Sequence, residues 1–432
     1  MNLLVVGGGG REHTIIKKLR ENKNVSTIYC LPGNGGIAYD ASCVPIGAMD
    51  LDQIVTFARE HNVDFAIVGP DDPLAAGAVD KLEAAGIPAF GPTAAAAAIE
   101  GSKVFSKELM KKYDIPTAKY EVFDSADAAI AYIKNNNSFP VVIKADGLAL
   151  GKGVIIAEDM AQAREGIRSI MTDRIFGKSG DRVVIEEFLT GPEVSVLAFT
   201  DSKVMVPMLS SMDHKRALDG DKGLNTGGMG TIAPNPCYTE EIASLCMNTI
   251  FLPTMEAMNR EGRPFKGCLY FGLMLTEKGP KVIEYNCRFG DPEAQVVLSL
   301  LESDLLTIMQ SVVKGTLSDT PVVFRKGAAC CVVLASGGYP SSYEKGIPIE
   351  GLEQGQLPEG TVPGCYVFHA GTALKEDTLV TSGGRVMGVT ATADSLPLAI
   401  KTAYQGVEKI QFSGMHYRKD IGQRALQAAL SK

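Results

Sequence analysis

The chain has 432 residues, 42 Lys and Arg against 50 Asp and Glu, a formal net charge of −8 and 46 glycines. Its length is enough for about three domains, and 45% apolar with 21% charged residues excludes a disordered chain. The acidic balance argues against nucleic acid as a partner, although a local basic pocket could still bind anionic small molecules. Glycine exceeds its usual share of about 7%, and much of the excess lies in short clusters.

The sequence contains no apolar run near the roughly 18 residues that a membrane span needs, so we expect no membrane association. Residues 1–7 run directly into a strand pattern and lack the basic and hydrophobic regions of a signal peptide. The nine cysteines form no C-x-x-C pair and their number is odd, which favours reduced thiols in a cytoplasmic protein. The five histidines are too dispersed for a zinc site.

Residues 1–100 alternate apolar strand patterns with helix patterns, which predicts βαβ units around an open parallel sheet. The predicted strands are 3–6, 26–31, 64–68 and 87–90. Helices are predicted from about Arg11, over 51–60 and over 73–85.

A second α/β stretch follows from 101 to 325. Its predicted helices are 103–113, 126–134, 160–171 and 240–259, and its predicted strands are 119–123, 141–145, 154–157, 182–188 and 194–199, with a hairpin at 267–276 and 281–286. Residues 208–236 are polar and rich in glycine, and we expect a long irregular loop, which is usually functional. From 326 to 432 the pattern is strand-rich and ends in a helix at 397–410. The prediction is an α/β chain of three modules, 1–100, 101–325 and 326–432.

The first glycine cluster, Gly7 to Gly10, follows a strand and opens a helix, so its backbone N–H groups could bind an anion. A dinucleotide-binding fingerprint requires glycine where this sequence has Glu12, and no acid ends the second strand. We therefore favour the phosphate of a smaller substrate over NAD, with a tight strand-to-helix turn as the alternative. Loops 32–36 and 69–73 also follow predicted strands, whose carboxyl ends form the ligand crevice of open parallel sheets.

The segment from Lys144 to Gly153 superficially resembles a phosphate-binding P-loop. Its glycine spacing is one residue short, however, and Lys152 is followed by Gly153 instead of Ser or Thr. The glycines lie between two predicted strands, which favours a flexible lid over phosphates, with Lys144 directing a cation at them. The alternative is an ordinary hairpin with a mobile tip.

Another apolar strand ends in the acids Glu186 and Glu187, followed by Phe188 and Leu189. Glu186 could accept a hydrogen bond from an exocyclic amine, and the backbone of 187–189 could pair with the edge of an adenine. Glu193 could then bind ribose hydroxyls. Paired acids at a strand end are more often solvated surface groups, so this segment by itself is weak evidence.

The most informative strand contains Glu284 and Asn286. Residues i and i+2 of a strand face the same side, so these two side chains present two oxygen ligands together. Hard oxygen ligands suit Mg²⁺, which substrate phosphates then complete. Arg288 continues on that face and could bind a carboxylate or a phosphoryl group with two hydrogen bonds. The alternative is an exposed polar strand face.

Taken together, these features give the chain a family resemblance. Lys103, Lys144, the glycine lid, the segment 186–189 and the pair Glu284 and Asn286 resemble the ATP-grasp superfamily. More narrowly, the chain resembles the phosphoribosylamine–glycine ligase family over nearly its whole length and in the same order. The segments that carry this likeness are 8–13, 213–216, 225–230, 288–293 and 417–422.

The resemblance implies an ATP-grasp fold with an N-terminal open parallel α/β domain at 1–100. It also implies an ATP-grasp domain at 101–325, whose mobile lid subdomain covers about 118–193, and a strand-rich C-terminal domain at 326–432. The implied reaction joins glycine to 5-phosphoribosylamine through a glycyl phosphate intermediate, with ATP and Mg²⁺ or Mn²⁺, and the implied state is a monomer. No enzyme nucleophile is needed, because catalysis comes from positioning and charge neutralisation.

The resemblance also implies roles for single residues. Arg288, Lys144 and Asp213 are expected to be catalytic, and Glu284 and Asn286 to bind the metal. The expected ATP-binding residues are Lys103, Lys107, Lys144, Gly147, Gly151, Lys152, Gly153, Glu186, Glu187, Phe188, Leu189 and Glu193. The expected substrate-binding residues are Gly9, Gly10, Arg11, Glu12, Asn34, Gly69, Pro70, Asp213, Lys215, Asn225, Thr226, Gly227, Gly228, Met229, Gly230, Arg288 and Asp291.

One strand departs from the superfamily pattern, and one phosphate-binding lysine could be either of two residues. The strand at 269–274 lacks the additional metal-binding acid that many ATP-grasp enzymes have, so the ligands of a second metal stay open. Lys107 competes with Lys103 as the first phosphate-binding lysine, and spacing favours Lys103. The alternative functions are another ATP-grasp carboxylate–amine ligase and an ATP-binding regulatory module that has lost turnover. The retention of Glu284, Asn286 and Lys144 argues against the regulatory module.

Overall fold

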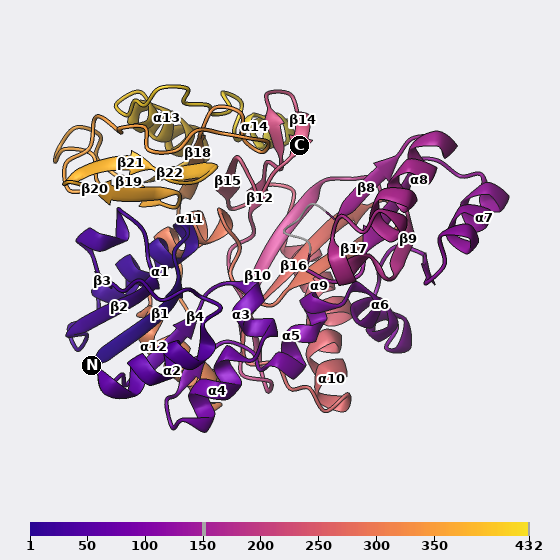
Figure 1. Ribbon diagram of the computed structural model, residues 1–432, viewed down its shortest axis with the longest axis horizontal. Coiled ribbons are helices and arrows are strands. Elements are labelled where there is room, and N and C mark those ends of the chain that lie inside the picture. The colour runs from indigo at the N-terminus through magenta and orange to yellow at the C-terminus, as the bar shows by residue number, and fades with distance from the viewer. Residues whose placement is uncertain (149–152, 431–432) are drawn as a thin grey trace.

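The computed structural model describes residues 1–148 and 153–430 (Figure 1). The N-terminal part is a five-stranded parallel sheet in the order β3-β2-β1-β4-β5. The predicted open parallel sheet and its four strands are confirmed, and β3 is an additional strand that the sequence pattern did not predict. Its strands are β1 (Asn2–Gly7), β2 (Thr27–Pro32), β3 (Ser42–Cys43), β4 (Phe65–Val68) and β5 (Ala89–Phe90). Because β2 and β4 flank β1 on opposite sides, the strand order reverses at β1, which is where such sheets bind ligands.

The helices of this part are α1 (Gly10–Arg20), α2 (Leu51–Glu60), α3 (Asp71–Ala75), α4 (Ala78–Ala84) and α5 (Ala94–Gly101). The single helix predicted over 73–85 is therefore two helices. Gly77 separates them with φ +87, a left-handed conformation that a continuous helix cannot contain.

Residues that follow α6 (Lys103–Lys112) form a small antiparallel sheet in the order β6-β9-β7-β8. Its strands are β6 (Tyr120–Phe123), β7 (Val141–Ala145), β8 (Val154–Ala157) and β9 (Val183–Glu187). The helices α7 (Ala126–Asn136) and α8 (Met160–Ile167) pack on one face around a separate apolar core that includes Ile143 and Ile167. Figure 1 shows this unit projecting from the rest of the molecule.

A second antiparallel sheet in the order β11-β10-β16-β17 faces this unit. Its strands are β10 (Glu193–Thr200), β11 (Met205–Pro207), β16 (Gly267–Thr276) and β17 (Gly279–Asn286). The helices α9 (Glu240–Cys246) and α10 (Leu252–Arg260) contribute Cys246, Met255 and Met258 to its buried core.

The pairing of β16 with β17 contains a β-bulge. Gly272 pairs with Glu284 and Leu273 pairs with Val282, so Ile283 is an extra residue in β17. Val282 before the bulge and Tyr285 after it are both buried in the core. The bulge therefore shifts the alternation by one residue, and Ile283 and Glu284 both face the opposite side.

The C-terminal sheet has the order β12-β15-β18-β22-β19 and carries α13 (Leu396–Val407). Its strands are β12 (Met212–Asp213), β15 (Gly230–Ala233), β18 (Ala328–Ala335), β19 (Cys365–His369) and β22 (Arg385–Ala393). The expectation of an irregular loop over 208–236 is wrong. This region supplies two strands of the sheet and the hairpin β13 (Arg216–Leu218) and β14 (Lys222–Asn225).

Two helices connect the layers. α11 (Glu293–Val297) and α12 (Leu305–Lys314) pack against α1 and share one apolar core with β1 and β16. The final described helix, α14 (Gln423–Leu430), lies beside the β13–β14 hairpin (Figure 1). Within residues 1–148 and 153–430, no helix is long and apolar enough to cross a membrane.

Candidate functional site

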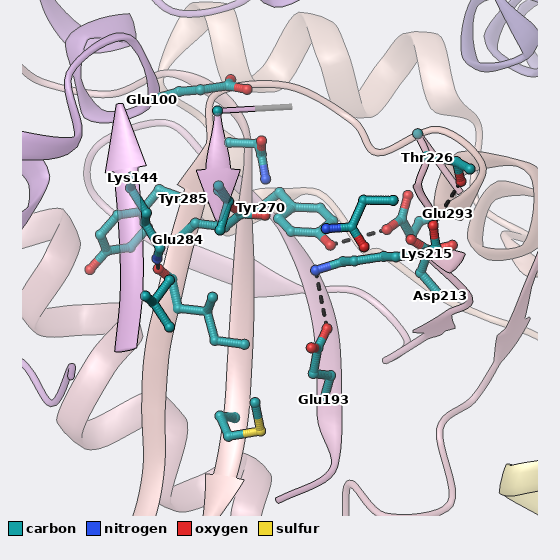
Figure 2. Close-up of a pocket in the computed structure, with 18 of the residues that line it drawn as sticks. Glu100, Lys144, Glu193, Asp213, Lys215, Thr226, Tyr270, Glu284, Tyr285 and Glu293 are labelled. Carbon is teal, nitrogen blue, oxygen red and sulfur yellow. Dashed lines mark hydrogen bonds and ion pairs between the residues drawn. The ribbon is translucent and has the colours of Figure 1, made fainter. Parts of the chain in front are cut away.

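The two antiparallel sheets and the C-terminal sheet enclose a cavity of about 930 Å³. At one end it is lined by Lys144 on β7, Glu186 on β9 and Glu284 on β17. At the other end it is lined by Asp213, the last residue of β12, and by Lys215, two residues further on (Figure 2). Predicted nucleotide residues and part of the predicted substrate residues therefore share one continuous space.

Three charged side chains from different elements meet at the nucleotide end. Lys144 Nζ lies 2.9 Å from Glu186 Oε1, and Lys107 Nζ lies 3.0 Å from Glu186 Oε2. All three are almost fully buried, and burial, opposed by Glu186, lowers the pKa of Lys107 to about 8. Lys107 also donates to Thr117 Oγ1 at 2.7 Å. Since both oxygens of Glu186 pair with lysines, its predicted contact with an exocyclic amine stays a prediction.

Lys103 has a different environment from Lys107. It lies at the first position of α6, and its Nζ donates to the carbonyl of Gly147 at 2.8 Å. Ser102 caps α6 and also donates to Asp146 at 3.0 Å, which ties the start of the helix to the end of β7. Among the described residues no carboxylate pairs with Lys103. Its charge is therefore less neutralised than that of Lys107, which supports Lys103 as the phosphate ligand.

The predicted glycine lid is described only in part. Gly147 has φ +118 and lines the cavity, and Gly153 lines it too. The carbonyl of Gly153 accepts from the N–H of Ala145 at 2.8 Å, which closes the base of the lid. The predicted contacts of Gly151 and Lys152 lie outside the described residues.

The segment that follows β9 lines the cavity with residues that include Phe188 and Leu189. Glu187 pairs with Lys281 Nζ at 2.8 Å. Burial by itself would raise the pKa of Glu187, but this contact is the main one that lowers it below its ordinary value. Glu193 pairs with Lys215 Nζ at 3.1 Å (Figure 2). Both acids are thus held by lysines from distant parts of the chain, Lys281 on β17 and Lys215 between β12 and β13, and the role of Glu193 in binding ribose stays a prediction.

The predicted metal ligands lie on β17 at and after the bulge. Glu284, Asn286 and Arg288 all line the cavity, so the structure brings this predicted group together. Burial by itself would raise the pKa of Glu284, but the positive charges of Lys215, Lys144 and Lys103 lower it below its ordinary value. Among the described residues nothing donates a hydrogen bond to this carboxylate. An ionised, unpaired carboxylate beside the amide oxygen of Asn286 fits a hard cation such as Mg²⁺.

The environment of Arg288 contains two acids that sequence reasoning did not single out. Its Nη2 lies 3.2 Å from Glu100 Oε1 and 3.9 Å from Asp71 Oδ2, and it donates to Asn286 Oδ1 at 3.2 Å. Glu100 Oε2 accepts from the N–H of Cys287 at 2.7 Å, and burial raises the pKa of Glu100. Glu100 thus holds the backbone of Cys287 and the side chain of Arg288, which follow the predicted metal ligands in the sequence.

Sequence signals for these two acids differ. Asp71 lies within the loop 69–73, which the sequence already places in the ligand crevice, although no site role is predicted for its side chain. Glu100 ends an alanine-rich helix and has no local signal at all.

The substrate end contains a second group of acids. Tyr270 donates to Glu293 Oε1 at 3.0 Å (Figure 2). Burial, together with the nearby Glu293, raises the pKa of Asp213 well above its ordinary value. Glu193 foremost raises the pKa of Lys215. Thr226 donates its hydroxyl to the carbonyl of Lys215 at 2.9 Å, which keeps the two segments adjacent.

Several predicted substrate-binding residues lie outside the cavity lining. Glu12 accepts from the N–H of Gly9 at 2.7 Å and completes a capping box at the start of α1. Asn34 donates to the carbonyls of Gly8 and His369 at 2.9 and 2.8 Å. Both side chains are thus engaged in the structure of the loops. The others outside the lining are Gly9, Gly10, Gly69, Pro70, Gly228, Met229 and Gly230.

Other predicted substrate residues do line the cavity. Arg11 donates to the carbonyl of Phe289 at 3.2 Å, and Asp291 accepts from the N–H of Arg11 at 3.4 Å. Burial would raise the pKa of Asp291, but Arg385 and Arg11 lower it. Asn225, Thr226 and Gly227 also line the cavity.

Two antiparallel sheets with a buried Lys–Glu cluster on one, and a Glu-x-Asn pair on the other, define an ATP-grasp protein. Family models narrow this class. Residues 1–100, 101–294 and 329–424 match the N domain, the ATP-grasp (A) domain and the C domain of phosphoribosylglycinamide synthetase. The chain belongs to the phosphoribosylglycinamide synthetase family.

Individual relatives agree with the family models. The phosphoribosylamine–glycine ligase of Caldanaerobacter subterraneus is 47% identical over 98% of this chain and 99% of its own length. A trifunctional purine biosynthetic protein of Gallus gallus is 46% identical over 98% of this chain, which spans 42% of that protein. The crystal structure of the phosphoribosylamine–glycine ligase of Thermotoga maritima has a TM-score of 0.84 and 33% identity, covering 98% of this chain and all of that one.

Proposed function

We propose that this chain joins glycine to 5-phosphoribosylamine with ATP, giving glycinamide ribonucleotide, ADP and phosphate in purine biosynthesis. The names of its relatives support this activity. The observation that carries it is the single cavity in which Lys144 and Glu284 share a space with Asp213, Lys215 and Thr226. A nucleotide and two small co-substrates can meet there without leaving the protein.

The reaction has two steps. A carboxylate oxygen of glycine attacks the γ-phosphorus of ATP, the bond to the bridging oxygen breaks, and ADP leaves. The amine nitrogen of phosphoribosylamine then attacks the carbonyl carbon of the glycyl phosphate. A C–N bond forms, phosphate leaves with the bonding electron pair, and the nitrogen loses a proton to phosphate or solvent. Both steps are accelerated by alignment and by fixed charges, without a covalent enzyme intermediate.

The proposed roles follow the positions of the charges. Lys103 and Lys144 bind the phosphates, and Arg288 binds the anionic oxygens of the glycyl phosphate with its planar guanidinium. Asp213 accepts a hydrogen bond from an amine of a co-substrate. Burial and the nearby Glu293 raise the pKa of this carboxyl, and the positive charge of a bound ammonium group would favour the ionised form that accepts the hydrogen bond.

Glu284 and Asn286 are the proposed ligands of Mg²⁺ or Mn²⁺. Such an ion would supply charge neutralisation at the triphosphate, and waters and phosphate oxygens would complete its coordination. The ionised and unpaired state of Glu284 supports this assignment. Within the described residues there is no group of three or more His, Cys, Asp and Glu side chains arranged as a metal cage, which agrees with a site completed by the substrate.

We further propose that the protein works as a cytoplasmic monomer on small-molecule substrates. None of the nine cysteines forms a disulfide, which supports a reducing compartment.

A coupled assay tests the function. Purified protein is incubated with ATP, Mg²⁺, glycine and freshly prepared phosphoribosylamine, and ADP release is measured. We expect ADP when both co-substrates are present and little when either one is omitted. Folded protein that releases no ADP would overturn the proposal. Release with another amino acid, but not with glycine, would instead identify a different carboxylate–amine ligase of the same superfamily.

A further inference from the structure

Arg385, the first residue of β22, reaches from the C-terminal sheet into the wall of the cavity. Its Nη1 donates to the carbonyl of Gly227 at 2.6 Å and to the carbonyl of Asp291 at 2.6 Å. The same nitrogen lies 3.5 Å from Asp291 Oδ1. One guanidinium therefore joins two loops that lie 64 residues apart in the sequence.

Tyr339 completes the contact from the same part of the chain. Its hydroxyl accepts from the N–H of Gly227 at 3.1 Å, so both backbone polar groups of Gly227 are held by the C-terminal part. A Cβ atom at Gly227 would lie 3.0 Å from Arg385 Cζ, which shows how closely the guanidinium packs on this backbone. We call Arg385 and Tyr339 the Gly227 holder.

The two loops that meet at Arg385 carry proposed substrate contacts. Thr226 precedes Gly227 and bonds to Lys215, while Arg288 lies three residues before Asp291. Asp291 also accepts from the side chain of Gln295 at 2.9 Å and from the N–H of Arg11 at 3.4 Å. A displaced Arg385 would therefore loosen one wall of the cavity at several points.

These contacts connect the C-terminal part of the chain to the cavity wall. We propose that Arg385 and Tyr339 are positioning residues for the ligase reaction, which fix Gly227 and Asp291 so that Thr226 and Arg288 face the co-substrates. This inference rests on the proposed function. It assigns to residues 339 and 385 an effect on co-substrates and not on the binding of ATP, whose proposed lysines lie on other elements.

A first experiment examines the holder without any activity measurement. Amide hydrogen exchange of the peptide 225–230 is compared in the wild type, Arg385→Lys and Tyr339→Phe. Lysine keeps the charge but lacks the planar guanidinium that packs on the backbone of Gly227, and phenylalanine removes only the hydroxyl. We expect exchange in this peptide to become at least tenfold faster in Arg385→Lys, and unchanged exchange in α6. Unchanged exchange at 225–230 would overturn the proposal, whatever the wild type catalyses.

A second experiment measures kcat, KM for each co-substrate, and the Kd of ATP without co-substrates. We expect Arg385→Lys to lower kcat/KM for the co-substrates roughly 100-fold, since misplacement of about 1 Å has that cost. Tyr339→Phe should lower it by about 2- to 10-fold, the loss of one hydrogen bond. The Kd of ATP should stay within twofold. The double variant should be no worse than Arg385→Lys, because both changes release the same residue.

Tyr343→Phe is the matched control, since this ring packs edge-on against Tyr339 with centroids 6.3 Å apart and contributes no hydroxyl to Gly227. It should behave as the wild type. A large effect of Arg385→Lys with none from Tyr339→Phe would mean that Arg385 binds substrate directly and would overturn the positioning role. Equal losses in ATP affinity, or losses in thermal stability with normal kinetics, would also overturn it. If the wild type showed no ligase activity while Arg385→Lys still speeded exchange at 225–230, the proposed ligase function would be contradicted and the Gly227 holder would stand.

Discussion

At the scale of single residues, Glu284 is the side chain whose environment best separates a functional from a structural role. Three lysines lower its pKa, yet no described group donates to its carboxylate. A buried acid that only stabilised the fold would be paired, because an unpaired buried charge is costly. The lysines therefore prepare this carboxylate for a ligand that the protein chain does not supply.

Glu284→Gln should lower kcat at least 100-fold and lower the melting temperature only slightly, because the substitution breaks no hydrogen bond but removes the negative charge that the three lysines favour. The ADP-release assay and thermal unfolding are the two measurements. Glu277→Gln, at the exposed turn of the same hairpin, is the control and should retain activity. Near-normal turnover in Glu284→Gln would show that the metal ligands are assigned to the wrong strand.

Glu100→Gln should also reduce kcat, by about tenfold or more, through Arg288. The amide oxygen can still accept from the N–H of Cys287, but the charge opposite the guanidinium is lost. Steady-state kinetics with circular dichroism measures the effect against folding. Asp72→Asn, an exposed neighbour of Asp71, is the control. Equal activity in wild type and Glu100→Gln would show that Asp71 and Asn286 suffice to orient Arg288.

At the scale of elements, the hairpin β13–β14 is fixed by the C-terminal segment. Arg418, 1% exposed, lies 2.8 Å from Asp221 and donates to both oxygens of Asp420 at 2.8 Å. Asp420 also accepts from the N–H of Gly220 at 2.9 Å. Burial would raise the pKa of Asp420, but Arg418 and the N–H of Gly220 lower it to about 2.

These contacts predict a pH dependence of stability. The folded-state pKa of Asp420 lies below its usual value of about 3.8, so the folded state favours the ionised form. Its contribution, at most about 2 kcal/mol, is complete above roughly pH 5 and is lost as the pH falls from about 4 to 2. Urea unfolding should therefore show Asp420→Asn less stable than the wild type at pH 6 and equally stable near pH 2. Glu359→Gln, an exposed acid of the same part, should show no such convergence.

Local elements were predictable where their own residues determine them. The bounds of β7, β8 and β16 agree with the sequence prediction, because apolar runs between turn residues mark each strand. The strands within 208–236 were not predictable. β15 pairs with β18, which begins at Ala328, so the pairing that orders it lies far along the chain.

The candidate site divides in the same way. Glu284, Asn286 and Lys144 stand in short motifs and meet in the cavity as expected. Glu100 and Arg385 have no motif, since their roles depend on neighbours that only the folded chain brings close. Glu12 shows the opposite limit. It belongs to a recognisable motif, yet its carboxylate caps the first helix. The residue types of the motif by themselves cannot distinguish such a cap from a contact with substrate.

At the scale of the whole molecule, the C-terminal sheet is built from two distant regions of the chain. β12 and β15 belong to the stretch between β11 and β16 of the second antiparallel sheet, whereas β18, β19 and β22 come after residue 327. A chain that ends at residue 327 would leave one edge of β15 without its partner and expose the apolar residues that β18 covers, including Ile232.

We therefore expect residues 1–327, expressed alone, to aggregate or to bind a hydrophobic dye, and not to bind ATP with the affinity of the full chain. Size-exclusion chromatography and dye fluorescence measure this, with the 432-residue chain as the reference. A monomeric fragment with a cooperative thermal transition and normal ATP affinity would show that the C-terminal sheet is a dispensable addition.

The bulge at Ile283 shifts the in-and-out alternation of β17 by one residue. Before it, the residues at even positions, such as Val282, enter the core; after it, the odd positions do, beginning with Tyr285. Deleting Ile283 would restore regular alternation without exchanging the faces, because Glu284 already pairs with Gly272 while Val282 and Tyr285 both enter the core. The deletion would instead remove the backbone carbonyl of Ile283, which accepts a hydrogen bond from Lys144 Nζ at 3.0 Å, whereas any substitution of Ile283 would keep it. The extra residue of the bulge therefore serves Lys144 through its backbone and not through its side chain.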